Sequence, residues 1–510
     1  MSNQTFEASE GVVLKKRVAM AAGALLLTML TWSLASPLGS THDELFHLGS
    51  IWCANGVDGK DCTAFNQPGE SGFYTGVAAI EDGSCFLDNP AEVTRCKTPV
   101  ASRYPANFKL YPSTYYKVMN LFVSEHPTLS VLAMRLFNGL LGVLLLSGVL
   151  LLSNGRQRMA WLTGYTFTLL PMTMYLTSSI HPSGWAVTGV GNSWIFLLIA
   201  ITTGRSNRKQ TGWAWALWAT STAMVFASRY DAFMFLLFSN FVVLVITLDV
   251  FRRLRLRHLA GLATLTVISL YLTSKVNGMV SWIFDFPLTE RVEFRKTSTW
   301  LSHWIVQTIW VPVQSLGVED LGQGTPGQYT VRLPGAVWII GVALLGAVLL
   351  LSLHTVRTEQ VAVLAGSYLL LAFVILSFNG RLERDLFNLS GRYVLPIFSF
   401  IVGYSVYLSK SPFQLIQIDR LRKMIIALLS IVHFLSLYSI VETNVDGQSH
   451  AVEVISVGTG GWWWTGLPLG PNFIVIFGSI LFTWFLVNSW STVIALQIGV
   501  VDTLKEKTND

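Results

Sequence analysis

The chain has 510 residues, of which 52% are hydrophobic and 13% are charged. A soluble domain carries roughly 25% charged residues, so this composition, with a mean hydropathy of +0.51, excludes an ordinary soluble protein. The net charge of +6 comes mostly from short basic clusters between apolar segments, which is typical of membrane proteins and does not indicate nucleic-acid binding.

Long apolar segments predict an all-α integral membrane protein. A membrane-crossing helix needs roughly 20 apolar residues, and the sequence contains about 12 such segments. They lie near residues 18–36, 129–152, 159–179, 185–203, 211–228, 232–250, 259–276, 335–353, 361–378, 394–408, 424–441 and 472–497. We expect an N-terminal segment over 1–17, a transmembrane core over 18–410, and C-terminal transmembrane helices with a tail over 411–510.

Basic residues in the connections set the expected orientation. Clusters such as 155–158 and 252–257 fall on one side of the predicted spans, and positive residues favour the cytoplasmic side. The first span follows the basic segment 15–17 without a convincing cleavage site, so we interpret it as an uncleaved anchor. Both termini are then expected in the cytoplasm, and two large loops, 37–128 and 277–333, are expected on the extracytoplasmic side.

All four cysteines, Cys53, Cys62, Cys85 and Cys96, fall in the first of these loops. An even number of cysteines in one extracytoplasmic loop indicates two disulfides in an oxidising compartment. Local pairing, Cys53 with Cys62 and Cys85 with Cys96, is our expectation among the three possible connectivities. Four free thiols are the alternative, and no cysteine spacing resembles a standard zinc site.

An adjacent acidic pair, Asp43 and Glu44, follows directly on the first span. Carboxylates at a membrane boundary cost free energy, so an acidic pair there is a candidate functional site. His47 would share a helix face with Asp43, and the two could bind a divalent ion such as Mg²⁺ or Mn²⁺, although two protein ligands are few. The structural alternative is that one of the carboxylates caps a short helix.

Arginines on the same side are candidates for binding an anion. Arg135 lies about two turns inside the second span, where its permanent charge needs Asp43, Glu44 or a lipid phosphate as partner, or must snorkel outward. Arg392 opens a late span in Gly391-Arg392-Tyr393, and Arg381 and Arg384 precede it. Three arginines near one helix start can grip a phosphate, whereas a solvated charge belt is the alternative reading for Arg381 and Arg384.

Short motifs complete this side of the protein. A rigid turn at Pro112 precedes Tyr115 and Tyr116, just before the second span. His181 begins the turn His181-Pro182-Ser183-Gly184, and Arg229 and Asp231 in another turn are expected to pair with each other. No phosphate-binding loop or dinucleotide fingerprint is present, so an activated substrate would come from the membrane.

At these residues the chain resembles the C-class (GT-C) membrane glycosyltransferases, which use lipid-phosphate-linked sugars and carry an essential acidic residue in the first outer loop. Asp43-Glu44 matches that pattern. The segment Pro112 to Tyr116 resembles a proline-tyrosine stretch found before the second span, and Arg135-Leu136 resembles the start of the next helix. The resemblance implies a GT-C-like fold.

More narrowly, Asp43-Glu44, His181-Pro182-Ser183-Gly184 and Gly391-Arg392-Tyr393 are together similar to a bacterial family of polytopic membrane proteins of unassigned function. That family is placed near the glycosyltransferases and is common in actinobacterial cell-envelope loci. The resemblance covers about 18–410. His42 stands where the family has a proline, and the turn that usually reads Asn-Pro-Asp has Ser183 in its third position, so an acidic group is missing there.

The resemblance implies an inverting glycosyltransferase in the bacterial inner membrane, with its site outside the cytoplasm. A sugar would move from a polyprenyl-phosphate donor to a hydroxyl of a cell-envelope glycan or glycolipid. Asp43 or Glu44 would be the general base. The donor phosphate would be held by Arg392, Arg384 and Arg135. Substrate contacts are expected from His47, Tyr115, Tyr116, His181 and Tyr393.

Two other functional classes remain open at this point. A transporter or flippase of lipid-linked saccharides would use the acidic pair and Arg135 as an ion-coupled pathway, but such charges usually lie near the bilayer midplane. A non-catalytic envelope assembly factor would use the disulfide-bearing loop as a docking surface, and no single carboxylate would then be essential.

Overall fold

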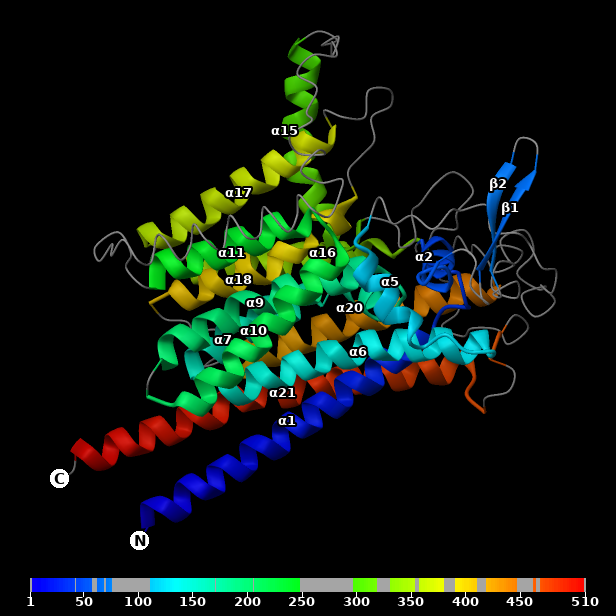
Figure 1. The fold of residues 1–510 in the computed structure, drawn as a ribbon. Helices are drawn as coiled ribbons and strands as arrows, with labels where there is room; N and C mark the ends of the chain where they lie inside the picture. The colour runs from blue at the N-terminus through cyan, green and yellow to red at the C-terminus, as the bar shows by residue number, and fades with distance from the viewer. Residues whose placement is uncertain are drawn as a thin grey trace.

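The computed structural model is a bundle of long helices with one small β-hairpin (Figure 1). The structure describes residues 2–41, 43–56, 62–67, 70–75, 111–169, 171–204, 206–247, 297–318, 331–353, 357–379, 390–410, 419–446, 462–464 and 468–508. The hairpin consists of β1 (Cys62–Gln67) and β2 (Glu70–Thr75), which pair antiparallel with Cys62 opposite Thr75. The predicted helical class holds for the bundle, and the hairpin is an addition to it.

Seven helices in the described part of the chain are long and apolar enough to cross a membrane. They are α1 (Ser2–Leu34), α6 (Pro127–Leu152), α9 (Pro182–Thr203), α16 (Gly335–Ser352), α17 (Thr358–Asn379), α20 (Asp419–Asp446) and α21 (Pro471–Thr508). A helix satisfies its own backbone hydrogen bonds, as a hydrocarbon environment requires of any spanning segment. The prediction of a helical membrane protein is therefore confirmed.

Helices that are shorter or less apolar cover most of the other predicted spans. They are α7 (Gly155–Thr168), α8 (Pro171–Thr177), α10 (Arg208–Ser228), α11 (Ala232–Thr247) and α18 (Phe398–Leu408). The predicted span at 259–276 lies outside the described residues, as do large parts of the two long loops. The expected total of about 12 spans, each of roughly 20 residues, therefore stays a prediction.

The prediction of one continuous helix over 159–179 is wrong. In the structure α7 ends at Thr168, and a separate helix, α8, begins at Pro171. A proline inside a helix lacks the N–H for one hydrogen bond, and its ring disfavours the helical conformation of the residue before it. Pro171 is thus the signal for the break that the apolar pattern concealed.

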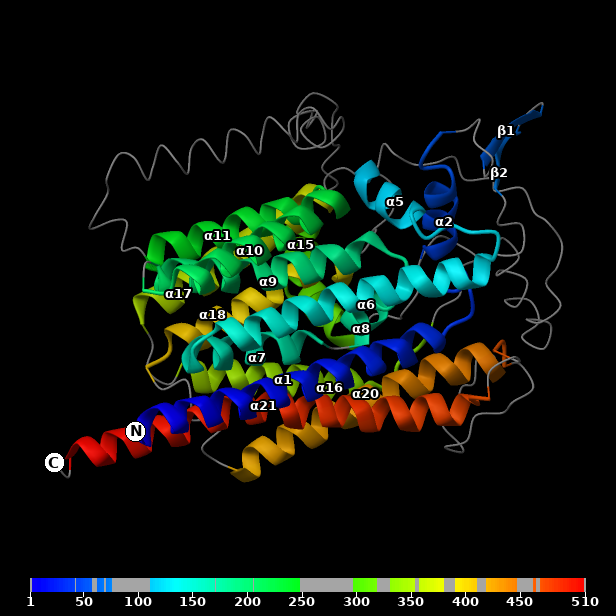
Figure 2. The ribbon, with the colours of Figure 1, turned by 60° about the horizontal axis from the view of Figure 1, so that its bottom comes forward.

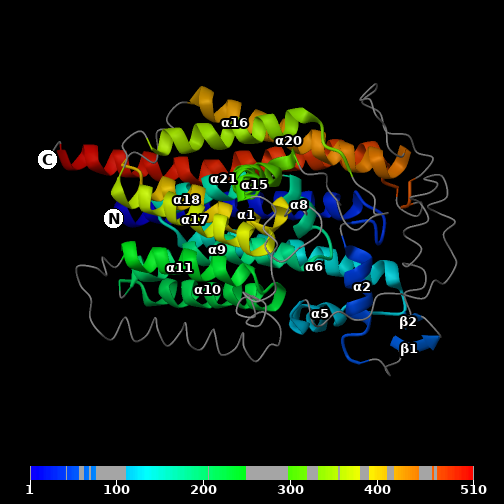
Figure 3. The ribbon, with the colours of Figure 1, turned by 90° about the horizontal axis from the view of Figure 1, so that it is seen from above.

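The two ends of the bundle differ in character (Figures 1 and 2). Both chain termini lie at one end. The opposite end carries the hairpin together with α2 (Glu44–Trp52) and α5 (Ser113–Asn120), and we call it the hairpin end. Figure 3, which looks from above, shows the same separation, with α1, α6 and α21 running from one end to the other. The two short helices between α1 and α6 are thereby placed beside the ends of several of the long helices.

The centre of the bundle is built around α9, whose side chains are buried along nearly the whole helix. The neighbouring α7 is also buried, and it packs against α18 at very short range. A Cβ atom at Gly164 of α7 would collide with the Ser399 carbonyl oxygen and lie 2.9 Å from the Gly403 nitrogen. Close approach of the two backbones therefore requires glycine at this position.

The C-terminal helices hold the end of α1 in place. The Trp32 indole N–H donates to His433 Nε2 of α20 at 2.7 Å, and the His433 ring stacks on Phe482 of α21 with centroids 4.1 Å apart. The indole of Trp464 donates to the Leu34 carbonyl at 2.8 Å and so satisfies one of the unpaired carbonyls at the helix end. These contacts fix the point from which the chain leaves α1 toward the hairpin end.

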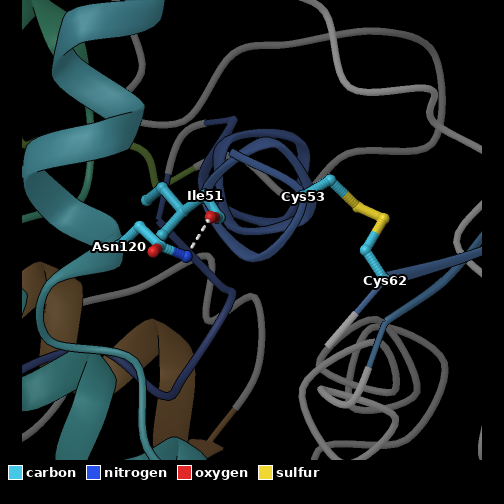
Figure 4. The surroundings of a disulfide bond; sticks show 4 residues. All are labelled: Ile51, Cys53, Cys62 and Asn120. Carbon is cyan, nitrogen blue, oxygen red and sulfur yellow. Dashed lines mark hydrogen bonds between the residues drawn. A yellow bond between two sulfur atoms is a disulfide. The ribbon is translucent and has the colours of Figure 1, made fainter. Parts of the chain in front are cut away.

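A disulfide joins Cys53, at the end of α2, to Cys62 at the start of β1 (Figure 4). The expected local pairing of these two residues is confirmed, whereas Cys85 and Cys96 lie outside the described residues. On the other side of α2, the Asn120 amide of α5 donates to the Ile51 carbonyl at 2.9 Å. The disulfide and this hydrogen bond fix the C-terminal end of α2. The residues at the N-terminal end of α2 therefore belong to a helix whose position is fixed.

We predict that Gly164→Ala lowers the thermal unfolding midpoint of the purified protein. The added methyl must push α7 and α18 apart, and overpacking of this kind costs about 1–3 kcal/mol. Gly212→Ala is the matched control, because a Cβ at Gly212 of α10 meets nothing within 4 Å. That control should be neutral or slightly stabilising, since alanine is favoured over glycine in helices by up to about 1 kcal/mol. Equal midpoints for the two variants would contradict the close approach.

Candidate functional site

A buried ion pair lies beneath the hairpin end. Arg135 of α6 donates from Nε to Glu44 Oε1 at 2.9 Å and from Nη2 to Glu44 Oε2 at 2.5 Å. Both side chains are fully buried. Glu44 is one of the three partners that the sequence left open for Arg135. A two-pronged contact of this kind is the strong form of an arginine–carboxylate pair.

The other N–H groups of Arg135 donate to backbone carbonyl groups. Arg135 donates from Nη1 to the carbonyls of Ser33 and Ser36, and from Nη2 to the carbonyl of Pro37, at 2.6 to 2.9 Å. Together with the two bonds to Glu44, all five guanidinium N–H groups are used. The carbonyls belong to the end of α1 and the turn after it, where the helix leaves its last acceptors unpaired.

Glu44 in turn accepts two backbone N–H groups. Its Oε2 accepts from Gly39 at 3.0 Å, and its Oε1 accepts from Ile180 at 3.3 Å. The Ile180 contact reaches the turn between α8 and α9, so this carboxylate joins the first loop to a second one. Glu44 and Arg135 therefore form a saturated structural joint.

Asp43 has a different environment from its neighbour. It is the one non-glycine residue with positive φ in the described chain, at φ 53° and ψ 12°, immediately before α2. Aspartate and asparagine tolerate this left-handed conformation better than most residues. Its Oδ2 lies 3.2 Å from Arg392 Nη1 and 3.7 Å from His181 Nε2. The Asp43 side chain is 23% exposed, whereas that of Glu44 is fully buried.

His181 is oriented by the helix that it precedes. It caps α9, and its Nδ1 accepts the backbone N–H of Ser183 at 2.9 Å. A neutral imidazole with Nδ1 as acceptor carries its proton on Nε2. The Nε2–H group therefore faces the Asp43 carboxylate. Gly184 allows this turn, because a Cβ there would lie 2.5 Å from the Leu176 carbonyl oxygen of α8.

His47 lies one helical turn after Asp43 and joins the same cluster. Its Nδ1 is 3.0 Å from the Tyr116 hydroxyl of α5. Its ring meets those of His181 and Tyr111 edge to face, with centroids 4.7 and 5.1 Å apart. Burial raises the pKa of Tyr116 well above its ordinary value, so the phenol stays protonated and can donate to His47.

Burial and charge set the protonation of the cluster. Burial raises the pKa of the Asp43 carboxyl, but the interactions with His181 and His47 outweigh it and leave the pKa below its ordinary value. Burial lowers the pKa of both imidazoles, and attraction to Asp43 offsets this only in part. Near neutral pH, Asp43 is therefore ionised beside two neutral histidines.

Arg229 and Asp231, in the turn between α10 and α11, form the expected pair. Arg229 Nε donates to Asp231 Oδ1 at 2.9 Å, and Nη2 donates to Oδ2. Arg229 Nη1 also donates to the Ser183 hydroxyl at 2.9 Å. The guanidinium carbon lies 4.3 Å from the centroid of the Tyr393 ring, within the range of a cation–π contact.

Arg392 reaches the cluster from a short 3₁₀ turn, η4 (Gly391–Tyr393), that precedes α18. A Cβ at Gly391 would collide with the backbone of Ser315 in η3 (Gln314–Val318), so glycine lets the two segments meet. Besides the pair with Asp43, Arg392 Nη2 donates to the Tyr393 hydroxyl at 3.5 Å. Arg392 Nε has no hydrogen-bond partner within the described part of the chain, although the side chain is only 11% exposed.

The structure thus brings together six of the residues predicted to act at the site. They are Asp43, His47, Tyr116, His181, Arg392 and Tyr393. Tyr115 lies behind them, with its fully buried ring 5.1 Å from that of Trp185. Arg384 lies outside the described residues. Within the described ranges no group of three or more histidine, cysteine or carboxylate side chains is placed to hold a metal ion.

Four contributors were not among the predicted site residues. Tyr111 packs on His47, Ser183 accepts from Arg229, and the Arg229–Asp231 pair supports Tyr393. The available signal was a pair of opposite charges in a turn of only a few residues between two apolar helices. Such charges cost free energy at a membrane boundary unless they contact something.

Comparison with known proteins places the chain in a family. A model of the predicted membrane protein family DUF2142 matches residues 26–401, so the protein belongs to that family. The matched stretch contains all the residues of the cluster and ends before α20. No curated protein matches the chain. No solved structure matches it either.

We predict that Glu44→Gln destabilises the protein strongly. It leaves Arg135 charged in a buried position, and breaking a buried pair by removing one partner costs about 3–5 kcal/mol. The matched control is Glu359→Gln in a pair with Arg357 whose side chains are 42% and 39% exposed. An exposed pair contributes about 1 kcal/mol or less, so its thermal unfolding midpoint should hardly move. Comparable shifts in the two variants would contradict the structural role of Glu44.

Proposed function

We propose that this protein is a membrane glycosyltransferase. It moves a sugar from a polyprenyl-phosphate donor to a hydroxyl of a cell-envelope glycan or glycolipid at the outer leaflet of the bacterial inner membrane. The observation that carries the proposal is the contact between Asp43 and Arg392, 3.2 Å apart at the end of the spanning helices. A carboxylate and a guanidinium in contact are the base and the phosphate-binding cation that such a transfer requires.

The environment of the acidic pair favours Asp43 as the base. Asp43 is ionised and partly exposed, so it can accept a proton from an acceptor hydroxyl. Glu44 is fully buried and already accepts from Arg135, Gly39 and Ile180. The acceptor hydroxyl would approach Asp43, whose carboxylate lies 3.7 Å from His181 Nε2.

Arg392 is favoured over Arg135 as the phosphate ligand for a similar reason. All five N–H groups of Arg135 are used within the protein, whereas the Nε of Arg392 has no partner in the described residues. An arginine with free donors matches a phosphate better than a saturated one. Arg384 stays part of the proposal as a second phosphate ligand.

The chemistry would be a single displacement that inverts the anomeric centre. Asp43 removes the proton as the acceptor oxygen attacks, and Arg392 stabilises the charge that develops on the leaving phosphate. The transition state resembles an oxocarbenium ion, as in glycoside hydrolysis. His47, Tyr116 and Tyr393 supply polar groups around this point for the sugar hydroxyls.

The position of the charges supports an enzyme over a transporter of lipid-linked saccharides. Coupling groups of transporters usually lie near the bilayer midplane, between discontinuous helices. Here Asp43, Arg392 and the Arg229–Asp231 pair all lie before or after helices at the hairpin end. In the proposed topology, a lipid phosphate at the membrane surface would reach them there.

We predict that Asp43→Asn lowers the transfer rate by about 10²–10⁴-fold, the usual contribution of general base catalysis. The measurement is sugar transfer from a panel of polyprenyl-phosphate sugars by the purified full-length protein. Glu125→Gln, an exposed change of the same charge in the connection between α5 and α6, is the control and should transfer at the wild-type rate. Wild-type transfer by the Asp43 variant would remove Asp43 as base.

A further inference from the structure

In the proposed transfer, the Arg392 guanidinium contacts the base, Asp43, and also binds the leaving phosphate. We propose that Arg392 exchanges its counter-ion during the reaction, from the Asp43 carboxylate to the phosphate that leaves. Proton removal from the acceptor and departure of the phosphate are then coupled through this one side chain. The inference rests on the proposed function and adds how charge is balanced within the same site during the transfer.

The carboxylates and guanidinium groups of the site form ion pairs, each without net charge. Glu44 is neutralised by Arg135, and Asp231 is neutralised by Arg229, each through a two-pronged contact. The third pair, Asp43 with Arg392, differs from both because it rests on one ion-pair contact of 3.2 Å. It is therefore the pair that an incoming anion can separate at the lowest cost.

The groups that face Asp43 come from four directions. His47 lies on its own helix, His181 precedes α9, and Arg392 belongs to η4. Tyr111 and Tyr116 face it from the segment that leads into α5 and from α5 itself. The two histidines are neutral and the two phenols are protonated, so among these described groups Arg392 is the permanent cation.

The proposed step conserves charge at the site. The acceptor O–H bond breaks and its proton goes to the Asp43 carboxylate, while the acceptor oxygen bonds to the anomeric carbon. The bond from that carbon to the phosphate oxygen breaks, and its electron pair leaves with the lipid phosphate. One negative charge thus disappears at Asp43 and one appears on the phosphate. The total negative charge beside Arg392 is therefore the same before and after the step.

This exchange avoids an uncompensated charge in a partly buried site. Charges interact more strongly where water is excluded, so a free Arg392 cation or a free phosphate dianion would be costly there. A guanidinium suits the exchange because its fork offers donors in several directions, whereas an ammonium group is a single point charge. Arg392 has Nη1 on Asp43 and an unpartnered Nε in the described chain.

A consequence is that Asp43 and a bound phosphate compete for Arg392 before the reaction. Removing the charge of Asp43 should therefore tighten phosphate binding and, at the same time, lower the transfer rate. If Asp43 were a base that did not compete with the phosphate for Arg392, replacing it would leave phosphate binding unchanged. A carboxylate that helped to hold the donor, directly or through a metal, would weaken binding when replaced.

The test is the affinity of the purified full-length protein for undecaprenyl phosphate in neutral-lipid nanodiscs. Asp43→Asn should bind about tenfold more tightly than the wild type, where each tenfold corresponds to about 1.4 kcal/mol. Arg392→Gln should bind at least about tenfold more weakly, because the phosphate loses its cation. Asparagine fits the left-handed backbone of position 43, so the variant keeps the turn. Its unfolding midpoint, measured alongside, should fall by less than that of Glu44→Gln, because the Asp43 side chain is 23% exposed and that of Glu44 is fully buried.

Glu125→Gln separates the local effect from a general change of charge and should bind as the wild type does. Equal or weaker binding by Asp43→Asn, with binding by the wild type, would overturn the counter-ion exchange and leave the proposed function standing. Absence of binding by the wild type and by both variants would instead remove the polyprenyl-phosphate donor, and the proposed function with it.

Discussion

The buried pair of Arg135 and Glu44 is the interaction on which the hairpin end depends. A helix that ends near a membrane surface leaves carbonyl groups that neither water nor the helix itself satisfies. Arg135 takes up those of Ser33, Ser36 and Pro37, and Glu44 neutralises its charge. The same pair therefore ends α1, sets the direction of the next loop and places the start of α2.

Adjacent carboxylates acquire opposite roles from this arrangement. Because Glu44 must point inward to Arg135, a left-handed turn at the preceding residue directs the Asp43 carboxylate outward to Arg392 and His181. The saturated pair supplies rigidity, and in the proposed transferase the singly contacted pair would supply the reacting groups. Rigid support beneath a reactive group is the usual requirement for an active site, because small misplacements of reacting atoms are costly.

Much of the fold could be predicted from the apolar segments, because a segment that crosses hydrocarbon must satisfy its own backbone hydrogen bonds and therefore forms a helix. The break at Pro171 was missed, since the apolar pattern runs through it. The local disulfide of Cys53 with Cys62 was the expected one of three connectivities that the four cysteines of one loop allow. The sequence also predicted that the candidate residues share one side of the membrane, and the structure brings six of them together. It could not distinguish Asp43 from Glu44, because their roles depend on one backbone rotation and on a partner 91 residues away.

The left-handed backbone at position 43 has a consequence for comparing members of the family. Asparagine and glycine would satisfy that backbone as well as aspartate does, so conformation alone permits all three. A family sequence with asparagine or glycine at this position would keep the turn and lose the carboxylate. The identity of this one residue therefore separates members that keep the turn alone from members that also keep the carboxylate proposed as the base.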